Sequence, residues 1–380
     1  MKKLKILHIN NFDKKGGAET VFDLTWKNLS EFQNFTGFIQ TDAEIKPDIK
    51  FSNWQDDGKI SGSINFIFSY KNYKALYKFL LENEIDIVHL QAYYSPISPS
   101  ILLALKKIKK KKTIKIIETL HGFHLICPNM SLFNYSKNEL CEKCIGRKFK
   151  FFIFKDNCDG RGYFYSFLKG IKSLVSNNII NHKKIIDKYI APSEFLKSKF
   201  VEDGIERSNI FVVRNPVLLV KGTANTKKEN LICYFGRFSR EKNIEFLIKA
   251  FSEWKLRCKN NYKLMLIGEG EEKNKLDEMI SKTGLSDDAV VKEFMDRERL
   301  HNEIKFAKFF ALTSKCYENF PMSVAEAVAL DILPIVPDIG GMQESVEVFF
   351  KIAQKRKKTR DLRGLQHRAQ GNRPGPAQGK

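Results

Sequence analysis

The stretch FFALTSKCYENFPMSVAEAVALDILPIVPDIGGMQE, at residues 309–344, decides the fold of this chain. It predicts a strand over FFALTS, a loop that carries Glu318, a helix from about Met322 to Leu330, a strand over LPIVP and a Gly-Gly turn. Apolar strands that alternate with helices are typical of a parallel sheet covered on both faces. We therefore expect an α/β protein whose ligands bind beyond the carboxyl ends of its strands.

Two carboxylates in this stretch, Glu318 and Glu326, are separated by seven residues. One lies just before the predicted helix and the other about one turn inside it, so both can face a ligand at the helix start. Backbone N–H groups and the positive end of the helix dipole would favour a phosphate there. The inner carboxylate could accept hydrogen bonds from a ribose diol. A nucleotide-sugar fits this arrangement, and two solvated glutamates beside a core helix are the alternative.

Two further junctions between a strand and a helix carry ligand-binding chemistry. Gly16 and Gly17 follow the strand LKILHIN and allow the backbone to approach a ligand closely. Arg237 and Lys242 follow the strand NLICYFG, where two cations could neutralise a diphosphate leaving group. Surface salt bridges are the alternative role for these two cations.

The motifs occur in an order that resembles one known family. ENFPMSVAE at 318–326 resembles the E-x7-E signature of the retaining glycosyltransferases of family GT4. Three other segments resemble further motifs of the same family: GGAE at 16–19, HGFHLICP at 121–128 and GRFSREKN at 236–243. The similarity runs in register from Lys3 to about Val348. The resemblance implies the GT-B fold, in which two Rossmann-like domains face each other across a cleft. It also implies retention of the anomeric configuration during glycosyl transfer.

The resemblance assigns a role to each matching position. Glu318 would position the donor sugar and Glu326 would bind the ribose, while Arg237 and Lys242 would hold the donor phosphates above the Gly16–Gly17 loop. His121, at the end of the strand in IKIIETLHGF, would line the reacting centre, whereas His124 is expected to be structural. No obligatory divalent metal is implied, because cations and a helix dipole replace it. The donor is expected to be a UDP- or GDP-sugar.

The expected domain organisation follows from the order of these motifs. It consists of an acceptor-side domain over 1–213, a linker over 214–230, a nucleotide-sugar-binding domain over 231–348 and a disordered basic tail over 349–380. The tail composition, rich in Arg, Gln, Gly and Pro, differs sharply from the preceding chain. We interpret it as a truncated or frameshifted end that leaves the second domain incomplete. Within the domains, INFIFS at 64–69 and AVVKEFMDRERL at 289–300 are predicted to be strands.

Four cysteines lie together in an expected insertion at about 127–158. Cys127, Cys141, Cys144 and Cys158 have the spacing C-x13-C-x2-C-x13-C, which matches a Cys₄ zinc site only in part. Disulfides are disfavoured in a reducing compartment. A structural zinc, a redox-sensitive cluster and four buried thiols remain as alternatives, and we interpret the insertion as one that orders an acceptor-side loop.

The formal net charge of +21 predicts an anionic partner. Nucleic acid is disfavoured because no helix-turn-helix, zinc-finger or RNA-binding signature is present. A membrane surface fits better, since KKIKKKKTIK at 106–115 and RKFKFFIFK at 147–155 combine cations with large apolar side chains. A solvated lysine face and a core strand are the alternative for these two segments. No apolar run is long enough to span a membrane, and the protein is expected in the cytoplasm, peripheral on the inner face of the membrane.

These observations predict a retaining glycosyltransferase that moves a sugar from a nucleotide-sugar to a saccharide or lipid-linked acceptor in cell-envelope, capsule or lipopolysaccharide synthesis. The alternative is a catalytically impaired glycosyltransferase-like protein that only binds a nucleotide or a membrane, which the unusual tail favours. The pyridoxal-phosphate lysine motif of a phosphorylase is absent from the sequence.

Overall fold

The computed structural model describes residues 3–12, 16–39, 46–216 and 227–351. The chain forms two compact units, and two short segments from its later part belong to the first unit. Unit 1 consists of Met1–Pro216, Ser314–Phe320 and Ile339–Gly341, and unit 2 of Val217–Thr313, Pro321–Asp338 and Met342–Lys380. The predicted tail from residue 352 onward lies outside the described residues, whereas residues 342–351 are helical.

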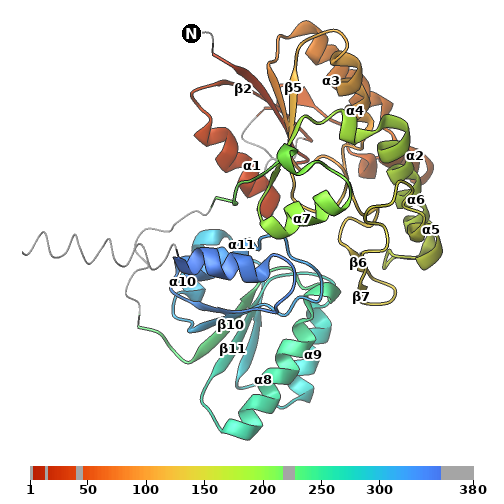
Figure 1. Ribbon diagram of the computed structural model, residues 1–380. Coiled ribbons are helices and arrows are strands. Elements are labelled where there is room, and N and C mark those ends of the chain that lie inside the picture. The colour runs from red at the N-terminus through yellow and green to blue at the C-terminus, as the bar shows by residue number, and fades with distance from the viewer. Residues whose placement is uncertain (1–2, 13–15, 40–45, 217–226, 352–380) are drawn as a thin grey trace, which may run out of the picture. The chain divides into compact units, whose positions relative to one another are not determined.

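Unit 1 is built on a seven-stranded sheet in which every neighbouring pair is parallel (Figure 1). The strand order is β3-β2-β1-β4-β5-β8-β9, so the order reverses between β1 and β4, where His8 pairs with His89. The strands are β1 (Lys5–Ile9), β2 (Gln33–Phe38), β3 (Ile49–Lys50), β4 (Ile87–Leu90), β5 (Lys115–Thr119), β8 (Lys188–Ala191) and β9 (Ile210–Val212). Ligands of doubly wound sheets bind at such a reversal.

Helices cover this sheet and bury its apolar strands. Leu76 and Leu80 of α3 and Leu105 of α4 are buried in one core with the strand residues Leu7 and Val88. The helices are α1 (Gly17–Asn28), α2 (Lys59–Ile67), α3 (Tyr70–Glu82), α4 (Ser100–Ile108), α5 (Phe152–Asp156), α6 (Tyr163–Leu174) and α7 (Glu194–Glu202), with short turns η1 (Trp54–Asp56), η3 (His182–Lys184) and η4 (Arg207–Asn209) and a π-helical segment η2 (Val175–Ile180).

Unit 2 is a five-stranded parallel sheet with the order β12-β11-β10-β13-β14. Its strands are β10 (Leu231–Phe235), β11 (Lys263–Ile267), β12 (Ala289–Lys292), β13 (Phe309–Ala311) and β14 (Leu333–Ile335). Helices α8 (Ile244–Cys258) and α9 (Lys273–Lys282) lie on one face, and α10 (Arg297–Ile304) and α11 (Met322–Ala329) on the other (Figure 1); a short turn η5 (Arg240–Lys242) precedes α8. Right-handed crossovers from a reversal between β10 and β13 require this distribution.

One predicted strand is wrong, and a second one ends earlier than predicted. INFIFS lies mostly in α2, because Phe66 packs on the Trp54 ring with centroids 5.1 Å apart and the β-forming residues yield to that contact. AVVKEFMDRERL is a strand only as far as Lys292. The Asp296 carboxylate accepts a hydrogen bond from the Arg299 N–H at 2.9 Å and thereby caps the start of α10. In the part of the chain that the structure describes, no helix is long and apolar enough to cross a membrane.

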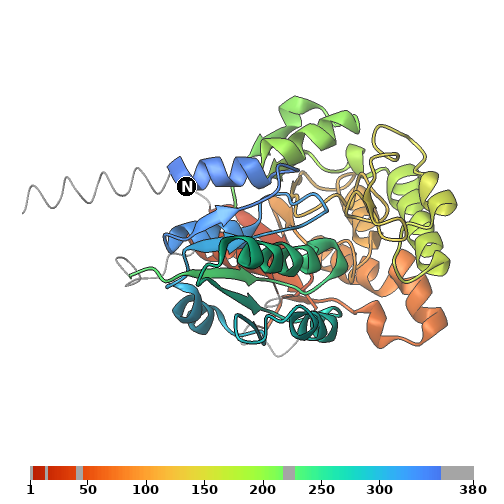
Figure 2. The same ribbon diagram turned by 90° about the horizontal axis from the view of Figure 1, so that it is seen from below.

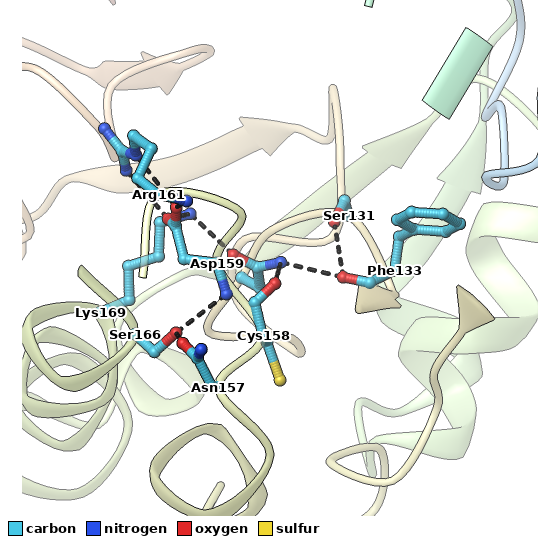
Figure 3. A network of polar contacts seen from close by, with 9 residues as sticks. Ser131, Phe133, Asn157, Cys158, Asp159, Arg161, Ser166 and Lys169 are labelled. Atoms are coloured by element: carbon cyan, nitrogen blue, oxygen red, sulfur yellow. Dashed lines mark hydrogen bonds and ion pairs between the residues drawn. The ribbon is translucent and has the colours of Figure 1, made fainter. Parts of the chain in front are cut away.

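The cysteine-containing insertion is ordered by hydrogen bonds. It carries a small antiparallel hairpin, β6 (Phe133–Asn134) and β7 (Glu139–Leu140), followed by α5. The Asn129 amide donates to the carbonyls of Phe133 and Cys158, both at 2.9 Å, and accepts from Lys169 at 2.7 Å. Lys169 also pairs with Asp159, which holds the chain next to Cys158 (Figure 3). One amide thus joins three segments of the insertion.

A buried ion pair fastens the insertion to the rest of unit 1. Lys150 is buried and its ammonium pairs with the buried carboxylate of Asp203, which also pairs with Lys183 at 2.8 Å. The same carboxylate accepts a hydrogen bond from the Gly146 N–H at 2.9 Å. Asp203 therefore neutralises two cations and satisfies one amide at a site that excludes water.

Replacing Asp203 by Ala leaves the buried Lys150 ammonium without its partner. We expect a loss of about 3–5 kcal/mol in the free energy of unfolding, measured by urea denaturation with circular dichroism. Glu278→Ala is the control, because Glu278 pairs with Lys282 on an exposed helix face, and we expect it to change stability by less than about 0.5 kcal/mol. Equal losses in the two variants would contradict the buried role of Asp203.

Candidate functional site

Neutral histidines line the carboxyl ends of the central strands of unit 1. His121, two residues after β5, lies with its Nε2 3.1 Å from Gln91 Oε1, and Gln91 directly follows β4. Burial, with a smaller contribution from His124, lowers the pKa of His121 to about 4. The imidazole is therefore uncharged at neutral pH and can exchange hydrogen bonds with a neutral hydroxyl.

A second pair, Glu118 and His124, lies at the same end of β5. Glu118 of β5 is fully buried, and its Oε1 lies 2.7 Å from Nε2 of His124. Burial raises the pKa of Glu118, while the hydrogen bond from His124 acts in the opposite direction. The His124 ring packs edge-on against Tyr93, with centroids 5.8 Å apart. His124 is thus held by Glu118 and Tyr93, and its structural role stays a prediction.

The Glu318 loop belongs to unit 1, although it follows a strand of unit 2. The Ser314 hydroxyl donates to Glu318 Oε1 at 2.7 Å, and the Asn319 amide donates to the main-chain oxygen of His121 at 2.9 Å. Within unit 1 the structure therefore brings Glu318 and His121 onto neighbouring segments.

The Gly-Gly turn fixes the path of this loop. The Gly341 N–H donates to the Glu318 carbonyl at 2.7 Å. A Cβ on Gly341 would lie 1.9 Å from the Asn319 oxygen, and Gly340 has a φ of +67°. Only glycines allow the turn to pass this close to the loop backbone.

Gly16 and Gly17 mark the start of α1 as the sequence predicted. Gly16 is the N-cap residue in an extended conformation, and its carbonyl accepts hydrogen bonds from both the N–H and the hydroxyl of Thr20 at 3.1 Å. Gly17 is the first residue of the helix.

The predicted phosphate-binding cations lie after β10 of unit 2. Arg237 is largely exposed, and its guanidinium lies 3.0 Å from the buried carboxylate of Glu241. Lys242 is half-buried, and its carbonyl accepts a hydrogen bond from the Thr313 hydroxyl at 3.1 Å. Thr313 follows β13, the neighbour of β10, so this bond joins the loops of the two strands at the reversal of the sheet.

Glu326, on α11, has two nitrogen-bearing neighbours, Arg297 and His301, that sequence reasoning missed. Arg297 Nη2 lies 3.4 Å from one carboxylate oxygen and His301 Nε2 lies 3.5 Å from the other. Both neighbours lie on α10; Arg297 lies in the segment that was predicted to be a strand, and His301 directly follows that segment. An Asp-Arg-Glu sequence after a strand is a helix-start signal, and it would have placed Arg297 and His301 on one helical face.

Comparison with known proteins shows where this arrangement belongs. The model described as Glycosyltransferase Family 4 matches residues 58–219, and the model described as Glycosyl transferases group 1 matches residues 219–354. This chain belongs to glycosyltransferase family 4. The resemblance inferred from the motifs is therefore confirmed.

Curated relatives of this family 4 chain match only in part. It is 26% identical over 172 residues to the lipopolysaccharide 1,6-galactosyltransferase of Escherichia coli K12, covering 42% of the chain and 46% of the relative. It is 25% identical over 117 residues to the alpha-D-kanosaminyltransferase of Streptomyces kanamyceticus, covering 31% and 30%. The matched part thus spans less than half of the length of these relatives.

Solved structures resemble the family 4 chain over most of its length. The lipopolysaccharide outer core galactosyltransferase WaaB in its apo form has a TM-score of 0.55 at 19% identity, covering 89% of this chain and 81% of WaaB. Anabaena Alr3699/HepE in complex with UDP and glucose has a TM-score of 0.59 at 15% identity, covering 94% and 91%. The predicted α/β fold of the GT-B class is confirmed.

The cysteines of this glycosyltransferase do not form the zinc site that their spacing allowed. All four are free, and Cys127, Cys144 and Cys158 are buried. Burial, with contributions from neighbouring thiols, raises the pKa of Cys144 and of Cys158 to about 12. Across residues 3–351, apart from the three undescribed gaps, no three His, Cys, Asp or Glu side chains are arranged to hold a metal ion.

Stability should fall as the pH drops below about 6.5, because His89 is buried without charge. Burial, followed by repulsion from His8 and His121, lowers the pKa of His89 from 6.5 to about 3. Between these values the unfolded chain binds a proton that the folded chain does not bind, so the free energy of unfolding falls by up to about 1.4 kcal/mol per pH unit.

His89→Gln tests this dependence. Glutamine can still reach the Thr119 hydroxyl, which His89 Nε2 contacts at 2.7 Å, but it does not titrate. Urea denaturation between about pH 7 and pH 5 should therefore show a shallower fall in stability for the variant than for the wild type. An unchanged slope would mean that His89 is not the titrating group.

Gly341→Ala should displace the Glu318 loop, because its Cβ would overlap the Asn319 oxygen. We expect faster amide hydrogen exchange over residues 317–320 and a lower melting temperature. Gly58→Ala is the matched control, since a Cβ on Gly58 meets nothing within 4 Å and its φ is −61°. Protection of residues 317–320 that is the same in both variants would contradict the close-contact role of Gly341.

Proposed function

We propose that this chain is a retaining glycosyltransferase that moves a sugar from a nucleotide-sugar to a saccharide or lipid-linked acceptor. The observation that carries the proposal is the hydrogen bond from Thr313 to the carbonyl of Lys242. It joins the loop of the two cations to the stretch that leads through Glu318 to Glu326, at the sheet reversal where α/β proteins bind their ligands.

The donor diphosphate would be held by Arg237, Lys242 and the N-terminal end of α11. Arg237 is bound to Glu241 on one side only, and a guanidinium has further N–H groups for a phosphate. Glu326 would accept hydrogen bonds from the ribose hydroxyls, with Arg297 and His301 fixing its carboxylate. Gly16 and Gly17 would let the backbone of α1 approach the phosphates.

In the reaction, the bond between the anomeric carbon and the diphosphate oxygen would break, and the acceptor oxygen would form a bond on the same face of the sugar. Glu318 would position the sugar hydroxyls and the neutral His121 would line the reacting face. The departing phosphate would take the acceptor proton, so no protein base is assigned. Fixed cations would replace a divalent metal at the leaving group.

The proposed pathway is cell-envelope, capsule or lipopolysaccharide synthesis on the cytoplasmic side of the membrane. A relative named as a lipopolysaccharide galactosyltransferase supports this direction, and the HepE structure, which holds UDP and glucose, makes UDP-sugars the first donors to test. The domain limits proposed are 1–213, 214–230 and 231–348, with the acceptor on the first domain.

Donor binding tests the site directly. Isothermal calorimetry with UDP-, GDP- and ADP-sugars should give saturable binding for one of them. Arg237→Ala and Glu326→Gln should each weaken it by roughly 10–100-fold, because each removes a charge-assisted hydrogen bond worth about 1.5–3 kcal/mol. Arg257→Ala is the control, since Arg257 is an exposed arginine of the same unit that pairs with Glu253. Equal affinity in all four proteins would sink the assignment.

Turnover separates the enzyme from its non-catalytic alternative. Incubation of the bound donor with envelope extracts should release nucleoside diphosphate, and NMR of the product should show the anomeric configuration of the donor. Addition of EDTA should leave the rate unchanged. Donor binding without transfer to any acceptor would favour the catalytically impaired reading, and an inverted product would overturn retention.

A further inference from the structure

Unit 1 exposes an unusual number of large apolar side chains on one group of helices. They are Phe149, Phe151, Tyr163, Phe164, Phe167 and Ile179, with exposed fractions of 44–71%, and we call them the aromatic face. Residues 147–169 contain eight aromatic residues in 23, against 12% in the whole chain. Such a concentration at the surface of a soluble fold marks an interaction site.

Ring contacts connect Phe151 and Phe167 of this face through Phe154. The Phe154 ring lies 6.0 Å from Phe151 and 5.7 Å from Phe167, so it bridges α5 and α6. The two helices pack so closely over Gly170 that an added Cβ would lie 2.4 Å from Phe154. Asn178 donates to the Lys148 carbonyl at 3.1 Å and ties η2 to the segment that precedes α5.

Helix α2 extends the apolar surface. It packs against α6, as Figure 1 and Figure 2 both show. Ile60 and Ile64, one helical turn apart, are 81% and 61% exposed. Only the end of this helix, from Ile64 onward, was predicted, and it was predicted to be a strand, so the exposed isoleucines escaped the sequence analysis.

Cations surround the aromatic face, and its acids are already paired. Residues 147–169 contain six cations and two acids. Asp156 pairs with Lys143 at 2.7 Å, and Asp159 pairs with both Arg161 and Lys169. Arg147, Lys148 and Lys155 are exposed at its edge. Aromatic rings bordered by lysine and arginine match the headgroup layer of an anionic bilayer.

The other basic segment does not contribute in the same way. In the lysine run, Lys106 donates to the Ile180 carbonyl, Lys109 pairs with Asp187, and Lys112 donates to the carbonyls of Leu81 and Asn83. Lys107 donates to the Tyr73 hydroxyl at 2.9 Å. These lysines bond to other segments of unit 1. The surface that binds an anionic membrane must therefore be sought elsewhere on the protein.

We propose that the aromatic face, extended by α2, docks this protein on an anionic lipid bilayer. The aromatic rings and isoleucines would enter the headgroup layer, while Arg147, Lys148 and Lys155 would pair with lipid phosphates. This inference goes beyond the proposed glycosyl transfer and uses none of its donor-binding residues. A lipid-linked acceptor would meet the protein at this surface.

Vesicle flotation tests the proposal without any sugar donor. The full chain should float with vesicles of phosphatidylglycerol and phosphatidylcholine, more weakly at high salt, and should stay in solution with phosphatidylcholine alone. Phe151→Ser combined with Phe164→Ser should lower the partition coefficient roughly tenfold. The matched control is Phe246→Ser combined with Leu256→Ser, two residues of α8 that are 57% and 78% exposed.

A tryptophan reporter guards against a folding artefact. Phe164→Trp should gain blue-shifted emission on addition of anionic vesicles, and Phe246→Trp should not. Equal flotation of the two serine variants, or emission from Phe164→Trp that vesicles leave unchanged, would overturn the proposal. A drop in oligomeric mass on light scattering for the Phe151/Phe164 variant, with flotation unchanged, would assign the face to a second protein molecule instead.

Discussion

Parallel strands that are covered on both faces leave polar chemistry only at their ends, and this constraint organises the whole molecule. Leu7, Val88 and Ile116 are fully buried along their strands, as are Cys233 and Phe310 in unit 2. Ligand-binding groups therefore collect where the strands stop, and the reversal of strand order opens a place for them. Gln91, His121 and Thr313 all occupy such ends. The five strands of unit 2 repeat the order of the first five strands of unit 1, and each sheet therefore has its own reversal.

The close passage of Gly341 over the Glu318 loop adds the second constraint. The loop that carries Glu318 is held by apolar contacts, because the Tyr317 ring lies 5.0 Å from Phe195 and 6.4 Å from Phe123, and by hydrogen bonds that involve main-chain atoms. The hydrogen bond from Gly341 to the Glu318 carbonyl and that from Asn319 to the His121 carbonyl supply two of them. Two adjacent residues of the loop are thus tied to other segments of unit 1, and the Ser314 hydroxyl orients the Glu318 carboxylate.

Sequence patterns predicted the fold well where the apolar periodicity and the loop residues at the ends of each element agreed. The helix over Met322–Ala329, the strand that leads to Arg237 and the strand that leads to His121 all have apolar runs bounded by loop residues. The strand predicted over INFIFS is wrong because this segment lies mostly in α2, where Ile60 and Ile64 are exposed. An exposed helix that is rich in β-forming residues has the sequence pattern of a strand. The contacts of Glu326 with Arg297 and His301 join residues 25–29 positions apart in the sequence, and only the structure reveals them. Likewise, the spacing of the four cysteines allowed a metal site. Only the structure shows that three of these cysteines are buried and that the hydrogen bonds of Asn129 order the segment around them.

The contacts of the lysines at 106–112 determine how acetylation of these residues would affect unit 1. Lys106 and Lys112 bond to main-chain carbonyls at the ends of helical segments, where backbone oxygens lack partners within the helix. Acetylation would remove the charge and two of the three donors from each ammonium. Modification in this run would therefore uncap helix ends and loosen the core of unit 1, whereas acylation of an exposed lysine such as Lys155 would change only the surface charge. The same residue type thus serves as a fastener in one place and as a solvent-facing charge in another.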